Sequence, residues 1–157
     1  MKNSEAREFM HISGEIDSLY HEAALKFGVS DSVLNTLYVL CEKGNQCLQS
    51  DVFRLTGMSR QTINTAIRKL EKDEMVYLEQ GAGRNTIVCL TEKGKEFCGK
   101  NISSLLEIED MIWSEWTVEE RTQYLTLTQK YRDALKKYLG EILDKRGGTM
   151  SAGSAYE

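Results

Sequence analysis

Apolar residues recur every three or four positions near the start of the chain, which is the pattern of an amphipathic helix. Within residues 5–27 the apolar positions are Phe9, Ile12, Ile16, Leu19, Tyr20, Ala23 and Phe27. Gly28 can end this helix, and Ser30 or Asp31 can cap a second one. The buried positions expected for the second helix are Val33, Leu34, Leu37, Tyr38 and Cys41. The start of the chain therefore predicts two helices, each with one apolar stripe.

The middle of the chain predicts two short helices followed by a β-hairpin. Residues 49–57 predict the first helix, which ends in a tight turn at Gly57. Ser59 can cap the second helix, which runs to about Asp73. Two strands flank a Gly-containing loop, and they span residues 75–80 and 86–90. Two helices joined by a short Gly turn and followed by a hairpin predict a winged helix-turn-helix.

Two more helices are expected after the hairpin. Thr91 can cap the fifth helix, and Thr117 with Glu120 forms a capping box for the sixth. Their inner positions are expected to be Phe97, Ile102, Leu105, Ile112 and Trp113, then Tyr124, Leu127, Tyr131, Leu135, Tyr138 and Ile142. The expected fold is mostly α with a small β-hairpin wing. Its parts are N-terminal helices in residues 1–43, a winged helix-turn-helix in 44–95, C-terminal helices in 96–146 and a disordered tail in 147–157.

The second helix of the winged helix-turn-helix has two different sides. At about 100° per residue, the apolar side holds Ile63, Ala66, Ile67 and Leu70. The opposite side holds Gln61, Thr65, Arg68 and Lys72, with Asn64 at its edge. Gln and Asn can pair with adenine, and Arg with guanine, through the base edges. No acidic residue occurs from Ser59 to Leu70, so nothing on this side repels a phosphate backbone.

The candidate DNA contacts come from this helix and from the hairpin loop. They are Ser59, Arg60, Gln61, Thr62, Asn64, Thr65, Arg68, Lys69 and Lys72 in the helix, and Arg84 and Asn85 in the loop. Arg84 at the loop tip can reach a minor groove or a phosphate. A solvated helix face and a solvated loop arginine are the plainer interpretations. A winged-helix dimer that contacts another protein without binding DNA is the alternative function, for which a more apolar face is expected.

Charge is unevenly distributed along the chain. The 157 residues carry a net charge of −4. Residues 44–95 hold eight Lys or Arg and six Asp or Glu, so this segment is +2 and the remainder is −6. This small asymmetry fits a DNA-contacting module on an acidic scaffold. Proline is absent, which suits a largely helical chain.

Other classes of function lack their sequence signatures. The four cysteines have no CxxC spacing and both histidines lie far from them, so no metal site is expected. Four free, mostly buried thiols are the favoured interpretation, with an oxidant-sensing thiol as the alternative. There is no Gly-rich phosphate loop and no nucleophile–base spacing, so we expect neither an enzyme nor a cofactor. With no secretory signal and no apolar run near the roughly 18 residues that span a bilayer, we expect a cytoplasmic protein without a membrane partner.

The middle of the chain resembles the MarR family of bacterial transcriptional regulators. The resemblance rests on Leu48–Leu70, on Lys72-Asp73-Glu74-Met75-Val76 and, most characteristically, on Leu90-Thr91-Glu92-Lys93-Gly94. It implies a triangular homodimer in which N- and C-terminal helices interlock and each subunit presents one winged helix. It also implies that Arg84 is the wing-tip arginine that enters the minor groove. The family often has an aspartate two residues before this arginine, where this chain has Ala82.

The long apolar stripes of the first and last helices favour dimerisation over packing within one subunit. A dimer would read two half-sites about one DNA turn apart, so a near-palindromic operator is expected. The resemblance further implies a repressor that a small-molecule effector releases by changing the arrangement of the two recognition helices. The effector candidates are His11, Tyr20, His21, Tyr38 and Trp113. Each of these is more commonly a core or surface residue.

Overall fold

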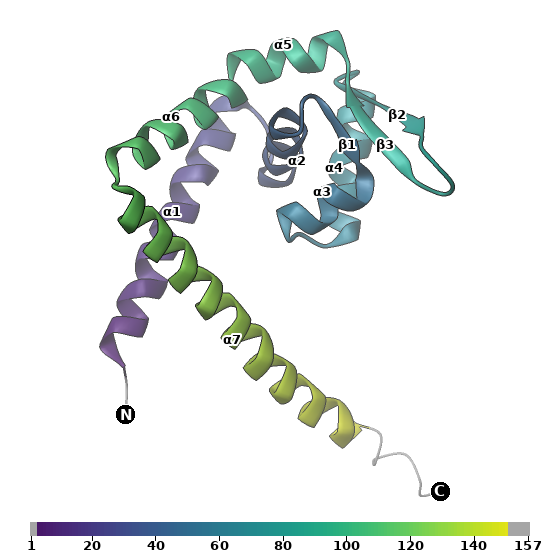
Figure 1. The fold of residues 1–157 in the computed structure, drawn as a ribbon. Helices are drawn as coiled ribbons and strands as arrows, with labels where there is room; N and C mark the ends of the chain where they lie inside the picture. The colour runs from purple at the N-terminus through teal and green to yellow at the C-terminus, as the bar shows by residue number, and fades with distance from the viewer. Residues whose placement is uncertain (1–2, 151–157) are drawn as a thin grey trace, which may run out of the picture. The chain divides into compact units, whose positions relative to one another are not determined.

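The computed structural model describes residues 3–150, with backbone alone for residues 147–150. Within this range the chain forms seven helices and a three-stranded sheet (Figure 1). It divides into two units, Met1–Ile108 and Glu109–Glu157. The expected fold class, mostly α with a small β wing, is confirmed. No helix in the described part of the chain is long and apolar enough to cross a membrane.

Helix α2 (Asp31–Glu42) lies in the middle of the first unit. The other helices that contact it are α1 (Ser4–Phe27), α3 (Gln49–Thr56), α4 (Arg60–Lys72) and α5 (Glu92–Lys100). Ser30 caps α2, because its hydroxyl accepts a hydrogen bond from the Val33 N–H. The largest fully buried apolar side chains are Leu37, Leu40, Val52, Ile63, Ile67, Leu70, Val88 and Ile102. The apolar stripes predicted for the second and fourth helices therefore meet in one core.

Three antiparallel strands form the sheet, in the order β1-β3-β2. They are β1 (Gln46–Leu48), β2 (Val76–Gln80) and β3 (Thr86–Leu90). Strands β2 and β3 form the expected hairpin, which projects from the helices of its unit as a wing (Figure 1). Strand β1 has no sequence signal of its own, since three residues after a Gly-Asn turn are too few to show alternation. This strand pairs with β3 and ties the wing to the start of α3.

The Leu-Thr-x-x-Gly run after the wing forms a packed junction. The Thr91 N–H donates to the Met75 carbonyl (3.0 Å), and the Thr91 hydroxyl donates to the Glu74 carbonyl (2.6 Å). The Gly94 N–H in turn donates to the Thr91 hydroxyl (3.0 Å), which caps α5. A Cβ at position 94 would overlap the Met75 carbonyl oxygen. The run therefore joins the start of α5 to the start of β2, and glycine alone fits at its end.

The expected fifth helix is in fact two helices. Helix α5 ends at Lys100, and α6 (Ile102–Glu115) begins after Asn101, whose φ of −120° is not helical. The Asn101 side chain donates to the Phe97 carbonyl (3.0 Å), a local bond of the kind that competes with helix continuation. Ile102 is buried as expected, whereas Ile112, expected to be an inner position, is exposed.

The second unit contains the end of α6 and the long helix α7 (Val118–Met150). The expected capping box is present: the Thr117 N–H donates to Glu120 Oε2 (2.8 Å) and the Glu120 N–H donates to Thr117 Oγ1 (3.1 Å). Helix α7 continues through residues 147–150, which the sequence analysis assigned to a disordered tail. Residues 151–157 of that expected tail lie outside the described residues.

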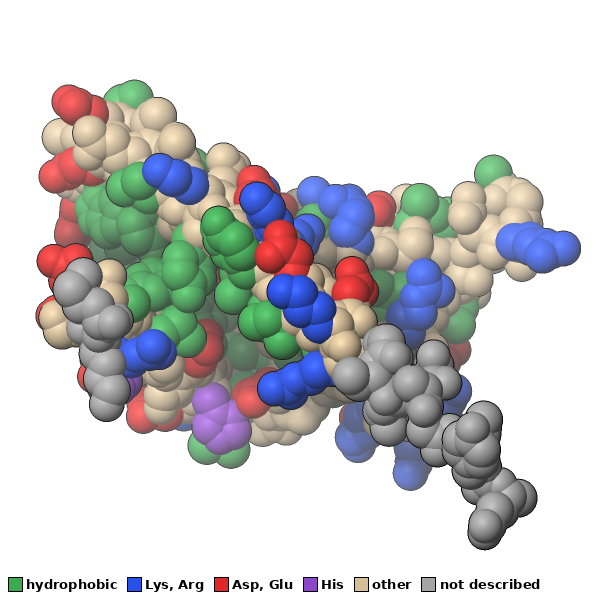
Figure 2. All heavy atoms as spheres, turned by 90° about the horizontal axis from the view of Figure 1, so that it is seen from below, with side chains coloured by type: hydrophobic (Ala, Val, Ile, Leu, Met, Phe, Trp, Pro, Cys, Tyr) green, Lys and Arg blue, Asp and Glu red, His purple; other side chains and the backbone are tan. Residues whose placement is uncertain are grey.

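Large apolar side chains are exposed on α1 and α7, and hydrophobic side chains cover a broad part of the face seen in Figure 2. On α1 the exposed residues include Phe9, Ile12, Ile16, Leu19 and Leu25. On α7 they include Leu127, Leu135, Tyr138, Leu139, Ile142 and Leu143. None of the described side chains of α7 is buried. Because helices are stabilised mainly by packing, both surfaces are suited to an interface.

Candidate nucleic-acid interface

A cap and an apolar side fix helix α4 within its unit. The Ser59 hydroxyl accepts a hydrogen bond from the Thr62 N–H (3.1 Å) at the helix start. All four positions predicted to face inward are buried: Ile63, Ala66, Ile67 and Leu70. The first turn contains no acidic residue, so the positive end of the helix dipole is open to an anion. Burial of one side sets the rotation of the helix and leaves the opposite side in solvent.

The solvent side of α4 is polar and cationic. Gln61, Thr65, Arg68 and Lys72 are all exposed along it, and Asn64 at its edge is half-buried. The only carboxylate in this helix is that of Glu71. The face therefore presents amide, hydroxyl and cationic groups to solvent, which are the groups that bind base edges and phosphates.

Asn64 is held in place by a residue that the sequence analysis does not single out. The Gln49 amide at the start of α3 donates to Asn64 Oδ1 over 2.9 Å. The contact is partly buried and joins the two helices of the helix-turn-helix. The two amide N–H groups of Asn64 and one lone pair of its oxygen then remain to bind a partner. Fifteen residues separate the pair, so no local spacing rule could have identified Gln49.

Other candidates on α4 also have local partners. The Thr65 hydroxyl donates to the Gln61 carbonyl over 2.9 Å, and the hydroxyls of Ser59 and Thr62 lie 2.8 Å apart. Lys69 Nζ forms an ion pair with Asp73 over 3.0 Å.

The Arg60 guanidinium lies 5.3 Å from the centroid of the Phe53 ring of α3, a cation–π contact that orients it at the helix start. These residues are preorganised, but part of their hydrogen-bonding capacity is already used.

By contrast, the side chains of Gln61, Arg68 and Lys72 make no hydrogen bond or ion pair within the described residues. A partner could bind them without first breaking an intramolecular contact. The three lie at intervals of seven and four residues, which place them along one side of the helix. They are therefore the strongest candidates on α4 for direct contact with a ligand.

Backbone and amide bonds shape the tip of the wing. The Gly81 N–H donates to the Asn85 carbonyl (2.8 Å), and the Gln80 amide donates to the Gly83 carbonyl (2.9 Å). Gly83 has a φ of +64°, a left-handed conformation that most residues avoid. Arg84 and Asn85 are exposed at this tip. Arg84 has no carboxylate partner in the described part of the chain, in keeping with Ala82 two residues before it.

Four of the five effector candidates lie in the first unit and are not gathered into one site. His11 and Tyr20 are exposed on α1, and Tyr38 on α2 packs against the core. His21 Nδ1 lies 2.8 Å from Asp31 Oδ1, so this histidine links α1 to the start of α2. The structure thus gives His21 and Tyr38 local roles within the fold.

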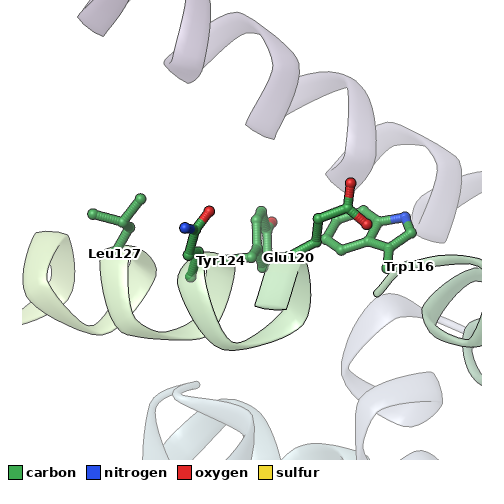
Figure 3. Close-up of a pocket in the computed structure, with 5 residues that line it drawn as sticks. Trp116, Glu120, Tyr124 and Leu127 are labelled. Atoms are coloured by element: carbon green, nitrogen blue, oxygen red, sulfur yellow. The ribbon is translucent and has the colours of Figure 1, made fainter. Parts of the chain in front are cut away.

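Trp113, the fifth candidate, lies in an aromatic cluster of the second unit. Its ring centroid is 5.2 Å from that of Trp116 and 5.8 Å from that of Tyr124, and the last two are 5.3 Å apart. Beside this cluster is a hollow of about 340 Å³, which Figure 3 shows. Its lining consists of Trp116, Glu120, Gln123, Tyr124 and Leu127. From the sequence pattern Tyr124 is expected to be an inner helix position, and no motif indicates Trp116.

Comparisons with known proteins agree with this architecture. Residues 27–84 match the model of the MarR family. The fold is similar to NMB1585, a MarR family regulator from Neisseria meningitidis, with a TM-score of 0.76, 17% identity, and coverage of 89% of this chain and 99% of that one. It is also similar to MepR of Staphylococcus aureus in its DNA-binding conformation, with a TM-score of 0.69, 22% identity and coverage of 83% and 98%.

A third similar structure is Sco3205, a MarR family transcriptional regulator from Streptomyces coelicolor in complex with DNA. Its TM-score is 0.64 at 15% identity, with coverage of 86% of this chain and 90% of that one. A search of curated proteins finds no match. The family match covers α2, the helix-turn-helix and the first strand of the wing, and the structural matches extend over most of the chain. The chain therefore resembles the MarR family in sequence over residues 27–84, and it shares the fold of these regulators over most of its length.

Proposed function

We propose that this chain is a sequence-specific DNA-binding transcriptional repressor that acts as a homodimer. The observation that carries the proposal is the solvent side of α4. Gln61, Arg68 and Lys72 are exposed there without intramolecular partners among the described residues. Within α4, no carboxylate precedes that of Glu71. Gln and Arg match the hydrogen-bonding edges of bases in the major groove, and Lys binds phosphate. A face for protein contact would be more apolar.

The wing supports the same proposal. Arg84 stands at the exposed tip of a hairpin whose backbone is held by its own hydrogen bonds. An arginine in this position can enter the minor groove beside the segment that α4 reads. Together, α4 and the wing would contact adjacent grooves of one duplex, with Ser59, Arg60 and Asn85 as supporting phosphate contacts.

The exposed apolar residues of α1 and α7 support homodimerisation. A 33-residue helix without a buried side chain among its described residues needs a partner to be stable. In a two-fold dimer the same surface of each chain meets its counterpart, so both stripes are covered together. Two copies of α4 would then read half-sites about 34–36 Å apart, which makes the operator near-palindromic.

Control by a small molecule belongs to the same proposal. The hollow beside Trp116 offers aromatic rings and the carboxylate of Glu120 in one place. A neutral or cationic aromatic compound would match this lining. Such an effector releases DNA only if it binds the DNA-free arrangement of the dimer more tightly than the bound one.

The decisive experiment is to sequence the genomic fragments that the purified full-length protein retains. The expected result is enrichment of a near-palindromic site whose half-sites are one helical turn apart. Retention of random fragments would contradict sequence-specific binding. Retention of no DNA, with a specific protein recovered instead, would favour the winged-helix dimer that serves protein contact alone.

A further inference from the structure

One polar side chain at the edge of the solvent side of α4 is held by a residue of another helix. The Gln49 side-chain amide donates a hydrogen bond to Asn64 Oδ1 over 2.9 Å, and the contact is partly buried. Among the described residues, the other side chains of α4 that form hydrogen bonds do so with neighbours in the same helix or in its caps. Asn64 is therefore the candidate whose hydrogen bonding is set by the tertiary fold and not by α4 itself.

The core and the sheet fix the backbone at both ends of this hydrogen bond. Gln49 begins α3 directly after Leu48, the last residue of β1, which pairs with β3. One turn further along α3, Val52 is fully buried. On α4, Asn64 directly follows the fully buried Ile63, and the two helices pack against each other. The hydrogen bond therefore joins two positions that have little freedom to move apart.

The hydrogen bond also decides which group of Asn64 faces away from α3. The oxygen and the nitrogen of a side-chain amide diverge from the same carbon, so an oxygen turned toward Gln49 turns the NH2 group away from it. An asparagine without such a partner can exchange the two groups, because its last torsion is broad and roughly two-fold. Gln49 removes this choice, and the group that α4 offers at position 64 is a hydrogen-bond donor.

We propose that Gln49 is a positioning residue that sets base preference through Asn64, an inference that rests on the proposed function. With its donors turned outward, Asn64 prefers a base that presents acceptors in the major groove. Guanine presents N7 and O6 and thymine presents O4, whereas adenine and cytosine each present an amino group. One position in each half-site should therefore favour guanine or thymine by about fivefold, the lower end of what one good base contact contributes.

A nearly isosteric substitution of Gln49 should invert this preference. Gln49→Glu replaces the donating NH2 group with a carboxylate, which only accepts hydrogen bonds. A carboxylate is tolerated there, because position 49 lies in the first turn of α3, where the helix dipole favours negative charge. The Asn64 NH2 group would then turn toward the new carboxylate, and Oδ1 would turn outward. The same position of the half-site should then favour adenine or cytosine, whose amino groups donate.

Selection from a pool of random-sequence duplexes tests this inference with full-length protein. Wild type, Gln49→Glu and Asn64→Ala each select bound duplexes, and the aligned sequences give the preferred base at every position. Wild type should favour guanine or thymine at one position, Gln49→Glu should favour adenine or cytosine there, and Asn64→Ala should show no preference there. Ser50→Glu is the matched control, because it adds the same charge at the exposed neighbour of Gln49. It should leave every preferred base unchanged.

Proton exchange of the side-chain amides, followed by NMR without DNA, measures the hydrogen bond by itself. In the wild type, the Gln49 NH2 protons should exchange more slowly than those of Asn64, and in Gln49→Glu the Asn64 protons should become slow. A residue that only supports the fold would change stability or overall affinity without exchanging the preferred base.

Two results would overturn the inference while leaving the proposed function intact. In the first, wild type selects a common sequence and Gln49→Glu keeps the same base at every position. In the second, the Asn64 protons of the wild type exchange more slowly than those of Gln49, which means that the amide has the opposite orientation. If the wild type selects no common sequence, the proposed function fails and this inference fails with it, while proton exchange still records the hydrogen bond.

Discussion

Asn64 and Arg68 lie one turn apart on α4 but offer different chemistry to a bound duplex. Asn64 Oδ1 accepts a hydrogen bond from the Gln49 amide, which uses one of its two lone pairs and fixes the orientation of the side chain. Pairing with adenine through two bonds needs a donor and an acceptor, so Asn64 would have to use the remaining lone pair of its oxygen. Its free N–H groups match O6 or N7 of guanine, or O4 of thymine. All the N–H donors of the Arg68 guanidinium remain available, so this side chain can donate two hydrogen bonds to a guanine edge.

Replacing Arg68 with alanine should therefore weaken DNA binding and relax base preference at one position. The expected loss is on the order of 1–3 kcal/mol, because a bidentate contact to a base edge would be lost. Gel-shift titration on the selected operator and on single-base variants measures both effects. Arg132→Ala is the matched control, since Arg132 is exposed on α7 and paired with Asp133. Equal affinities of wild type and Arg68→Ala would remove Arg68 from the interface.

The Gln49–Asn64 hydrogen bond can be measured in the absence of DNA. A double-mutant cycle with Gln49→Ala and Asn64→Ala should give a coupling of about 0.5–1.5 kcal/mol in the free energy of unfolding, since one partly buried hydrogen bond is lost in each single variant. Urea denaturation followed by circular dichroism provides the four values. Strictly additive effects would mean that the bond does not stabilise the folded state.

At the scale of elements, the junction after the wing depends on one glycine. Gly94 and Gly99 both lie in α5, but a Cβ would overlap the Met75 carbonyl at position 94 and meets nothing within 4 Å at position 99. Gly94→Ala should destabilise the protein by several kcal/mol, because backbone must move. Gly99→Ala should stabilise it by about 0.5–1 kcal/mol through helix propensity. Thermal melts compare the two variants. Similar melting temperatures would contradict the close packing of Gly94 against the Met75 carbonyl.

The wing should contribute chiefly through charge. Arg84→Ala is expected to lower affinity and to reduce the slope of log K against log salt by about one, since one phosphate neutralisation is lost. Arg84→Lys keeps the charge and should retain most of the slope. Fluorescence anisotropy of a labelled operator over a salt series gives both slopes. An unchanged slope in Arg84→Ala would place the wing tip away from DNA.

Elements with a strong local signal were predictable from sequence. The 3.6-residue period gave the buried side of α4, with Ile63 and Ile67 inward, and the capping box at Thr117 marked the start of α7. Features that depend on tertiary contacts were not predictable. Strand β1 exists because β3 lies beside it, and the break at Asn101 interrupts an apolar period that continues through it. For the same reason, periodicity gave the exposed face of α4 but not the contacts that already engage Asn64 and Lys69.

At the scale of the whole molecule, dimerisation should depend on the apolar stripe of α7. Leu135 is 44% exposed in the single chain, so Leu135→Glu should leave the fold of the chain intact. A carboxylate at an apolar interface is unpaired and costly, so this variant should be a monomer with a mass near 17.9 kDa. Loss of the second half-site contact should lower operator affinity by about 100-fold or more.

Light scattering and operator binding test this prediction together. Lys130→Glu is the control, because it adds a carboxylate to α7 on the side opposite Leu135 and should remain dimeric. A dimeric Leu135→Glu protein with normal circular dichroism would contradict the role assigned to this stripe.

The aromatic cluster of the second unit has an optical consequence. The chain contains two tryptophans, and both Trp113 and Trp116 belong to that cluster. Indole emission therefore reports on the second unit alone, while the unit that holds α4 is spectrally silent at the same excitation wavelength. Unfolding followed by emission and by far-ultraviolet dichroism would thus resolve the two units, and one tryptophan introduced near the wing would make the silent unit visible.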